Sequence, residues 1–181
     1  MFGLCSHCDQ FAWRVAERVS LCASLCAQSA AEAAAKLLSS PTAAQVTTTI
    51  HREALILYYC LSLRAASSET IVSRMRKVFH GWLRAEVVTN ALLPIEGLSD
   101  GDPKFVKDAA VNKLGTLLDQ REQAYGQGTD RKFETCAQIL SSQLDIGNAP
   151  RGWVEALPVL LTRAWSAVSD EVNEAILSLR S

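Results

Sequence analysis

Residues 54–63, which read ALILYYCLSL, include no charged side chain in ten positions. In a helix these apolar side chains point in every direction, and such a helix is normally surrounded by other helices. We therefore predict a helix over about 43–66 at the centre of the molecule. A strand is the alternative for Thr47, Thr48 and Thr49, but no second strand-like segment could pair with it.

The whole chain has the composition of a folded helical protein. Hydrophobic residues make up 49% and charged residues 20% of its 181 residues, with only nine Gly and five Pro. A chain of this length can bury roughly 70% of its unfolded surface. The sequence therefore predicts a single all-α domain over 1–181, a compact bundle of five to seven antiparallel helices.

Regular apolar spacings predict the helices around the central one. Pro94 is expected to end the helix that precedes it, and Pro158 is expected to kink or split the last helix. The segment 94–103, PIEGLSDGDP, is a predicted hinge between the halves 1–93 and 104–181. The predicted helices cover about 6–38, 69–93, 103–125, 130–147 and 153–179.

The net charge of −1 indicates no general attraction to nucleic acid or to anionic lipid. Charge is nevertheless uneven, because 1–93 carries nine basic and six acidic residues and 94–181 carries nine and thirteen. No segment approaches the roughly 20 apolar residues of a membrane-spanning helix. No secretory signal is visible either. We expect a cytoplasmic protein with reduced cysteines.

The motif with the clearest potential for redox chemistry or metal binding is Cys5-Ser6-His7-Cys8. Two thiols at the start of a helix could form a redox pair, because the helix dipole favours the thiolate. The tetrapeptide resembles the active-site motif of the alkylhydroperoxidase D-like family, which is also all-helical, and the resemblance implies peroxidase chemistry. It covers four residues, and Ala12 stands where that family carries a further histidine.

Zinc binding is a second interpretation of the same residues, with His7 as a spare ligand. Positions 8 and 22 would lie roughly 20 Å apart on one continuous helix, which disfavours a single metal site. If no zinc is bound, we expect no cofactor. We expect the other four cysteines to be buried as small apolar residues: Cys22, Cys26, Cys60 and Cys136. The four zinc ligands would be Cys5, Cys8, Cys22 and Cys26.

The 69–93 helix has one basic face. It could contact phosphate groups, but the near-neutral net charge makes a nucleic-acid partner unlikely. A solvated face is one alternative, and a docking surface for an acidic partner or for the acidic half of the chain itself is the other. The residues of this face are Arg76, Lys77, His80 and Arg84.

Glu86 lies near the centre of the apolar face of that helix, where an unpaired carboxylate is costly. His51, Arg52 and Glu53 are its candidate partners. A buried pair of His51 and Glu86 with Tyr58 nearby would be a candidate catalytic site. The alternative is that Glu86 lies where the helix leaves the core and that His51 lies in a solvated turn.

Two further apolar sets could bind a partner. Five aromatic residues could line a pocket for an apolar small molecule, or they could simply form core: Tyr58, Tyr59, Trp82, Trp153 and Trp165. A near-heptad stripe on the last helix could close the domain or pair with a second chain; it comprises Leu161, Trp165, Val168, Val172, Ile176 and Leu179.

No phosphate-binding glycine loop, zinc-protease helix, nucleophile elbow or paired-carboxylate motif is present. We therefore favour a non-catalytic interaction module over an enzyme. It would recognise a protein partner or a second copy of itself, a homo-oligomer, by placing an apolar helix face in a groove. Trp165, Val168, Val172 and Ile176 are its expected surface, with the basic face as a further candidate. The alternatives are a helical domain that binds an apolar ligand and a thiol-redox or zinc protein.

Overall fold

The computed structural model describes residues 6–37, 43–126, 131–144 and 152–180. All regular structure in these ranges is helical, and no strand occurs in them. The all-α prediction is therefore confirmed. None of the described helices is long and apolar enough to cross a membrane.

The helices lie close to the predicted positions. A π-helical turn, Val87–Leu92, joins α3 to α4, so these three segments form one continuous helix, and a short 3-10 turn, Ser178–Arg180, follows α8. The α-helices are α1 Ser6–Lys36, α2 Ala43–Ser68, α3 Ser73–Glu86, α4 Leu93–Ile95, α5 Lys104–Gly126, α6 Lys132–Gln143, α7 Trp153–Ser166 and α8 Ser169–Leu177.

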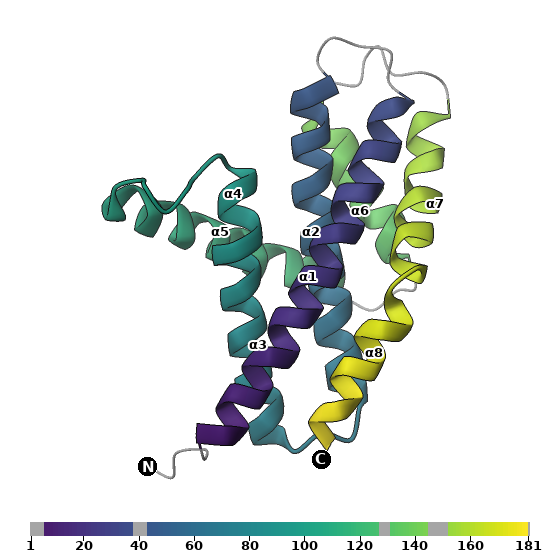
Figure 1. The fold of residues 1–181 in the computed structure, drawn as a ribbon. Coiled ribbons are helices and arrows are strands. Elements are labelled where there is room, and N and C mark those ends of the chain that lie inside the picture. Colours follow the sequence, from purple (N-terminus) through teal and green to yellow (C-terminus); the bar gives the residue numbers. More distant parts are fainter. Residues whose placement is uncertain (1–5, 38–42, 127–130, 145–151, 181) are drawn as a thin grey trace.

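Helix α2 is the centre of the bundle, as predicted. Eight consecutive residues from Glu53 to Cys60 are all buried, because α1, α3, α5, α6 and α8 all pack against α2. The threonine run at its start is helical. Figure 1 shows α1 running antiparallel to α2, with α3 on one side and α7 and α8 on the other.

Helix α1 approaches α2 closely because its inner face consists mainly of small side chains. Seven alanines of α1 are at most 3% exposed, and a row of small side chains lets two helix backbones come together. Ala is also the strongest helix former, which suits a helix of 31 residues. The seven are Ala12, Ala16, Ala23, Ala27, Ala30, Ala31 and Ala34.

Helix α5 is the exception to the antiparallel prediction, because it crosses the other helices (Figure 1). Its second half is attached to α2 through a buried carboxylate, Glu53, which is 0% exposed. Arg121 of α5 donates to both oxygens of Glu53, at 2.9 and 3.1 Å. Gln143 of α6 donates a third hydrogen bond at 3.1 Å. One charged group therefore connects α2, α5 and α6.

The prediction that Pro94 ends its helix is wrong, because the helix continues to Ile95. Proline lacks an N–H, so Pro94 cannot donate to the carbonyl of Asn90, four residues earlier. The backbone instead widens into the π turn, in which the N–H of Leu93 reaches the carbonyl of Val88. This wider turn carries the chain past the proline without ending the helix.

The break in the last predicted helix also lies elsewhere. Pro158 is inside α7, which continues to Ser166. The chain turns between α7 and α8, where Val168 leaves the helical conformation with φ −128°. The turn brings Val172 and Ile176 onto the bundle, where each is at most 1% exposed. Burial of Val172 and Ile176 stabilises the turn between α7 and α8.

The Glu53 cluster leads to a stability prediction. Arg121→Met should lower the free energy of unfolding by about 3–5 kcal/mol, because it leaves a buried carboxylate without its cation. Urea unfolding would measure the loss. The double variant Glu53→Met/Arg121→Met should recover part of it, since the buried charge is then gone as well.

The matched control is Arg18→Met. Arg18 pairs with Glu171 at 3.1 Å, but both side chains are about half exposed, so the loss should stay below about 1 kcal/mol. Equal losses for the Arg121 and Arg18 variants would contradict a structural role for the Glu53 cluster.

Candidate functional site

The N-terminal motif lies only partly within the described residues, because Cys5 is outside them. His7 is exposed and Cys8 is half-buried at the start of α1. The helix is continuous from Ser6 to Lys36, so Cys8 and Cys22 are separated by roughly 20 Å of helix. In the described part of the chain, no three His, Cys, Asp or Glu side chains could hold a metal ion together.

The predicted pair of His51 and Glu86 does not form. Glu86 accepts hydrogen bonds from Nε1 of Trp13 at 2.7 Å and from Nδ2 of Asn90 at 2.5 Å. His51 of α2 lies against a later part of α1, near the backbone of Ser24. Burial lowers the pKa of its imidazole. Ser24 and Trp13 are eleven residues apart on α1, or roughly 16 Å.

The third member of that prediction, Tyr58, has a structural role. Its hydroxyl donates to the carbonyl of Leu161 at 2.9 Å, and its ring stacks on Trp165 with centroids 5.3 Å apart. Trp153 likewise donates to the carbonyl of Ala34 at 3.2 Å. These side chains join α7 to α1 and α2, so they form core and do not line the predicted aromatic pocket.

The basic face of α3 is largely engaged within the chain. Arg84 donates to Asp119 at 2.7 Å and to the carbonyl of Gly115 at 2.8 Å, both on α5. Arg76 donates to the carbonyl of Glu69 at 2.9 Å, and His80 is half-buried, while Lys77 is exposed. The contacts of Arg84 agree with one of the predicted alternatives, in which the basic face docks on the acidic half of the same chain.

The stripe on the last helix closes the domain instead of lying open to a partner. Val172 is 0% and Ile176 is 1% exposed, and Trp165 and Val168 are half-buried against the same core. The turn between α7 and α8 rotates these side chains inward against α1 and α2. These four residues therefore pack within the domain and do not form the expected interaction surface.

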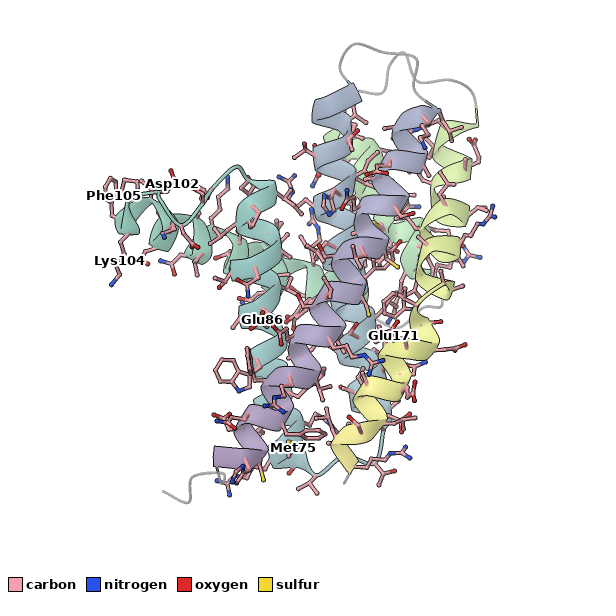
Figure 2. The ribbon with its side chains drawn as sticks, viewed as in Figure 1. Met75, Glu86, Asp102, Lys104, Phe105 and Glu171 are labelled. Carbon is pink, nitrogen blue, oxygen red and sulfur yellow. The ribbon has the colours of Figure 1, made fainter. Side chains whose placement is uncertain are left out.

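The sequence did not reveal the arm, which we define as residues 93–113: α4, the connection 96–103 and the first ten residues of α5. Figure 1 shows the connection and the first part of α5 extending sideways from the bundle, while α4 continues the line of α3. None of the side chains from Lys104 to Lys113 is buried. Phe105 is 75% exposed, and Figure 2 shows it near the free end beside Lys104 and Asp102.

The connection within the arm is a structured turn. Gly97 adopts φ +79°, which favours glycine. The carboxylate of Asp102 accepts hydrogen bonds from the backbone N–H of Ser99 at 2.7 Å and from its hydroxyl at 2.9 Å. Nζ of Lys107 donates to the carbonyl of Asp100 at 3.1 Å. These contacts tie the connection to the start of α5.

A groove of about 520 Å³ runs where the arm meets the bundle. Its lining includes the ion pair of Arg52 with Glu96, at 3.0 Å, and also Lys113. Four apolar side chains of the arm and of the next turn of α5 form its wall: Leu98, Ala110, Leu114 and Leu117. The groove thus combines apolar and charged side chains, and the arm itself supplies part of its lining.

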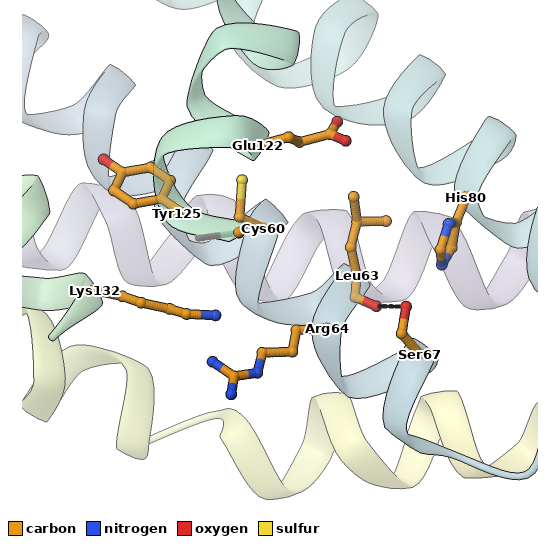
Figure 3. A pocket seen from close by; sticks show the side chains of 9 residues that line it. Cys60, Leu63, Arg64, Ser67, His80, Glu122, Tyr125 and Lys132 are labelled. Carbon is orange, nitrogen blue, oxygen red and sulfur yellow. Dashed lines mark hydrogen bonds between the residues drawn. The ribbon is translucent and has the colours of Figure 1, made fainter. Parts of the chain in front are cut away.

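A second pocket, of about 420 Å³, lies between α2, α3, α5 and α6 (Figure 3). It lies beyond the Glu53 cluster, on the part of α5 that is attached to the bundle. Its lining combines charged, thiol and apolar groups: Cys60, Leu63, Arg64, Ser67, His80, Glu122, Tyr125, Gly126 and Lys132.

The buried cysteines are poorly suited to nucleophilic chemistry. Burial raises the pKa of Cys26 to about 11 and the pKa values of Cys60 and Cys136 to about 12. Because the thiolate is the reactive form, these side chains remain protonated thiols at neutral pH. They behave as the small core residues that the sequence predicted.

These pKa values predict slow alkylation. With iodoacetamide at pH 8, Cys26, Cys60 and Cys136 should react at least about 100-fold more slowly in the folded protein than in urea, because less thiolate is present. Half-buried Cys8 should react before them. Peptide mass spectrometry would give the rate at each cysteine. Equal rates for Cys60 in the folded and urea-unfolded chains would contradict its burial and raised pKa.

Comparison with known proteins identifies no relative. No protein-family model, no curated protein and no solved structure matches this chain. Its function therefore has to be inferred from the geometry of its own side chains, of which the exposed arm, the groove beside it and the mixed pocket are the candidate sites.

Proposed function

We propose that this protein is a non-catalytic helical module that associates with a second copy of itself through the arm. In this dimer the arm of each copy lies in the groove of the other. A two-fold axis makes the two contacts equivalent, which is the commonest arrangement of homodimers. Recognition is of the helix-in-groove kind, in which an apolar surface fills a groove and rim charges set the orientation.

The observation that carries this proposal is the absence of buried side chains from Lys104 to Lys113. Most helices in proteins are stabilised by the packing of an apolar face, and these ten residues of α5 bury none of their side chains. Phe105, at 75% exposed, is the most exposed of the large hydrophobic residues in the described ranges. Both features favour an arm that is covered by a partner.

Charge favours a second copy as the partner. Residues 99–112 of the arm include three acidic residues and two basic ones, a net charge of −1, and the groove lining includes two basic residues and one acidic one, a net charge of +1. The arm of one copy therefore complements the groove of another. The acidic residues are Asp100, Asp102 and Asp108, and the basic ones are Lys104 and Lys107.

Two other expectations enter the proposal. The segment 94–103, predicted as a hinge, lies within the arm, where its hydrogen-bonded turn would present the arm to the groove of the partner. We also propose the cytoplasm as the compartment, because its reducing conditions keep thiols such as Cys22 and Cys60 reduced.

The test is sedimentation equilibrium of the wild type and of Phe105→Asp. The wild type should be a dimer whose melting temperature rises with protein concentration. Burying a Phe side chain contributes about 1.5–3 kcal/mol, so the variant should dissociate at least about tenfold more readily. Its far-UV circular dichroism should be unchanged, because Phe105 is 75% exposed and contributes little buried surface within one chain.

The matched control is Val159→Asp, which places the same charge on α7 at a side chain that is 66% exposed and outside the arm. It should leave the dimer intact. A monomeric wild type with a melting temperature independent of concentration would refute the proposal. Equal weakening by the two substitutions would show that the arm is not the interface.

A further inference from the structure

The pocket between α2, α3, α5 and α6 is separate from the arm and its groove. Its volume of about 420 Å³ is within the usual range of small-molecule sites, which is roughly 300–1,000 Å³. Four helices contribute to its lining, so its shape depends on the assembled bundle. Its charged groups are unevenly distributed, and this distribution indicates the kind of ligand.

Two cations lie on one side of the pocket. Arg64 follows Cys60 by one helical turn on α2, its side chain is exposed, and no ion pair involves it within the described residues. Lys132, at the start of α6, is only 8% exposed. Its ammonium lies near the thiol of Cys60. Figure 3 shows the cationic ends of Lys132 and Arg64 directed toward the same part of the pocket.

The carboxylate across the pocket is already engaged. Glu122 accepts a hydrogen bond from the hydroxyl of Tyr59 at 2.8 Å and pairs with Arg84 at 3.4 Å. His80 also lines the pocket, and burial, together with the nearby guanidinium of Arg76, lowers the pKa of its imidazole. With Arg64 and Lys132 positive and Glu122 negative, the lining has a net charge of +1.

The rest of the lining is largely apolar. The protonated thiol of Cys60, the side chain of Leu63 and the ring of Tyr125 belong to this lining. At Gly126 an added side chain would meet no atom within 4 Å, so this end of the pocket is open. A ligand in this pocket could therefore contact the cations Arg64 and Lys132 with one part and apolar groups such as Leu63 and Tyr125 with another.

We propose that this pocket binds a small organic carboxylate. The carboxylate group lies between Arg64 and Lys132, and an apolar body lies against Leu63 and Tyr125. The guanidinium of Arg64 is exposed and belongs to no ion pair within the described residues, and Arg binds carboxylates with two parallel hydrogen bonds. This binding site is independent of self-association, because none of its residues belongs to the arm or to the groove.

The test is calorimetric titration with 2-naphthoate and with its neutral analogue 2-naphthamide. The wild type should bind 2-naphthoate with a Kd of about 1 mM or tighter, as expected for an anion of this size. The amide should bind at least about tenfold more weakly, because a hydrogen bond to a charged group is the stronger one. In nuclear magnetic resonance spectra, the amide signals of Ser67 and Gly126 should shift.

Arg64→Gln should weaken 2-naphthoate binding at least about tenfold and leave 2-naphthamide binding unchanged. Arg163→Gln is the matched control, since Arg163 is an exposed arginine of α7 outside the pocket, and it should bind like the wild type. Phe105→Asp should also bind like the wild type, which separates this proposal from the dimer.

Three results would overturn the proposal. The first is no heat of binding with about 5 mM 2-naphthoate, a concentration well above the expected Kd. The second is equal binding by the wild type and Arg64→Gln. The third is a set of shifted signals centred on another part of the chain, which would place the anion elsewhere.

Discussion

The rest of the structure depends on the burial of α2. Eight consecutive residues, from Glu53 to Cys60, have to be covered on every side of the helix, and no single neighbour can cover all of them. Several helices, among them α1, α3, α5, α6 and α8, therefore surround α2. The small alanines of α1 allow one close neighbour, while the stacked rings of Tyr58 and Trp165 hold α7 against the other side.

The charge at the end of this buried segment determines where the arm lies. Glu53 cannot reach water, so its charge has to be met within the protein, and Arg121 of α5 meets it with two hydrogen bonds. Arg84 holds the same helix from α3. These contacts hold only the second half of α5, and its first ten residues extend beyond the bundle. The exposed arm and its groove are thus consequences of core packing.

The candidate site was predicted less well than the fold, and particular residues show why. A pair of His51 and Glu86 was one of two alternatives, because each is a polar group near an apolar run. In the folded chain Glu86 instead meets Trp13 and Asn90. Glu53 was considered only as a partner of Glu86, because Arg121 is 68 residues away along the chain. Nothing local to either residue indicates that helices α2 and α5 cross at this point.

The sequence by itself determined the helices and the position of the central one, because helix formation and amphipathic spacing depend on residues within a few turns of each other. It also indicated that Cys22, Cys26, Cys60 and Cys136 are core residues. Only the tertiary structure decided that α5 crosses the bundle, that Pro94 is accommodated by a π turn and that Val172 and Ile176 turn inward. Those outcomes depend on helix rotations and crossing angles, which are set by all the packed side chains together.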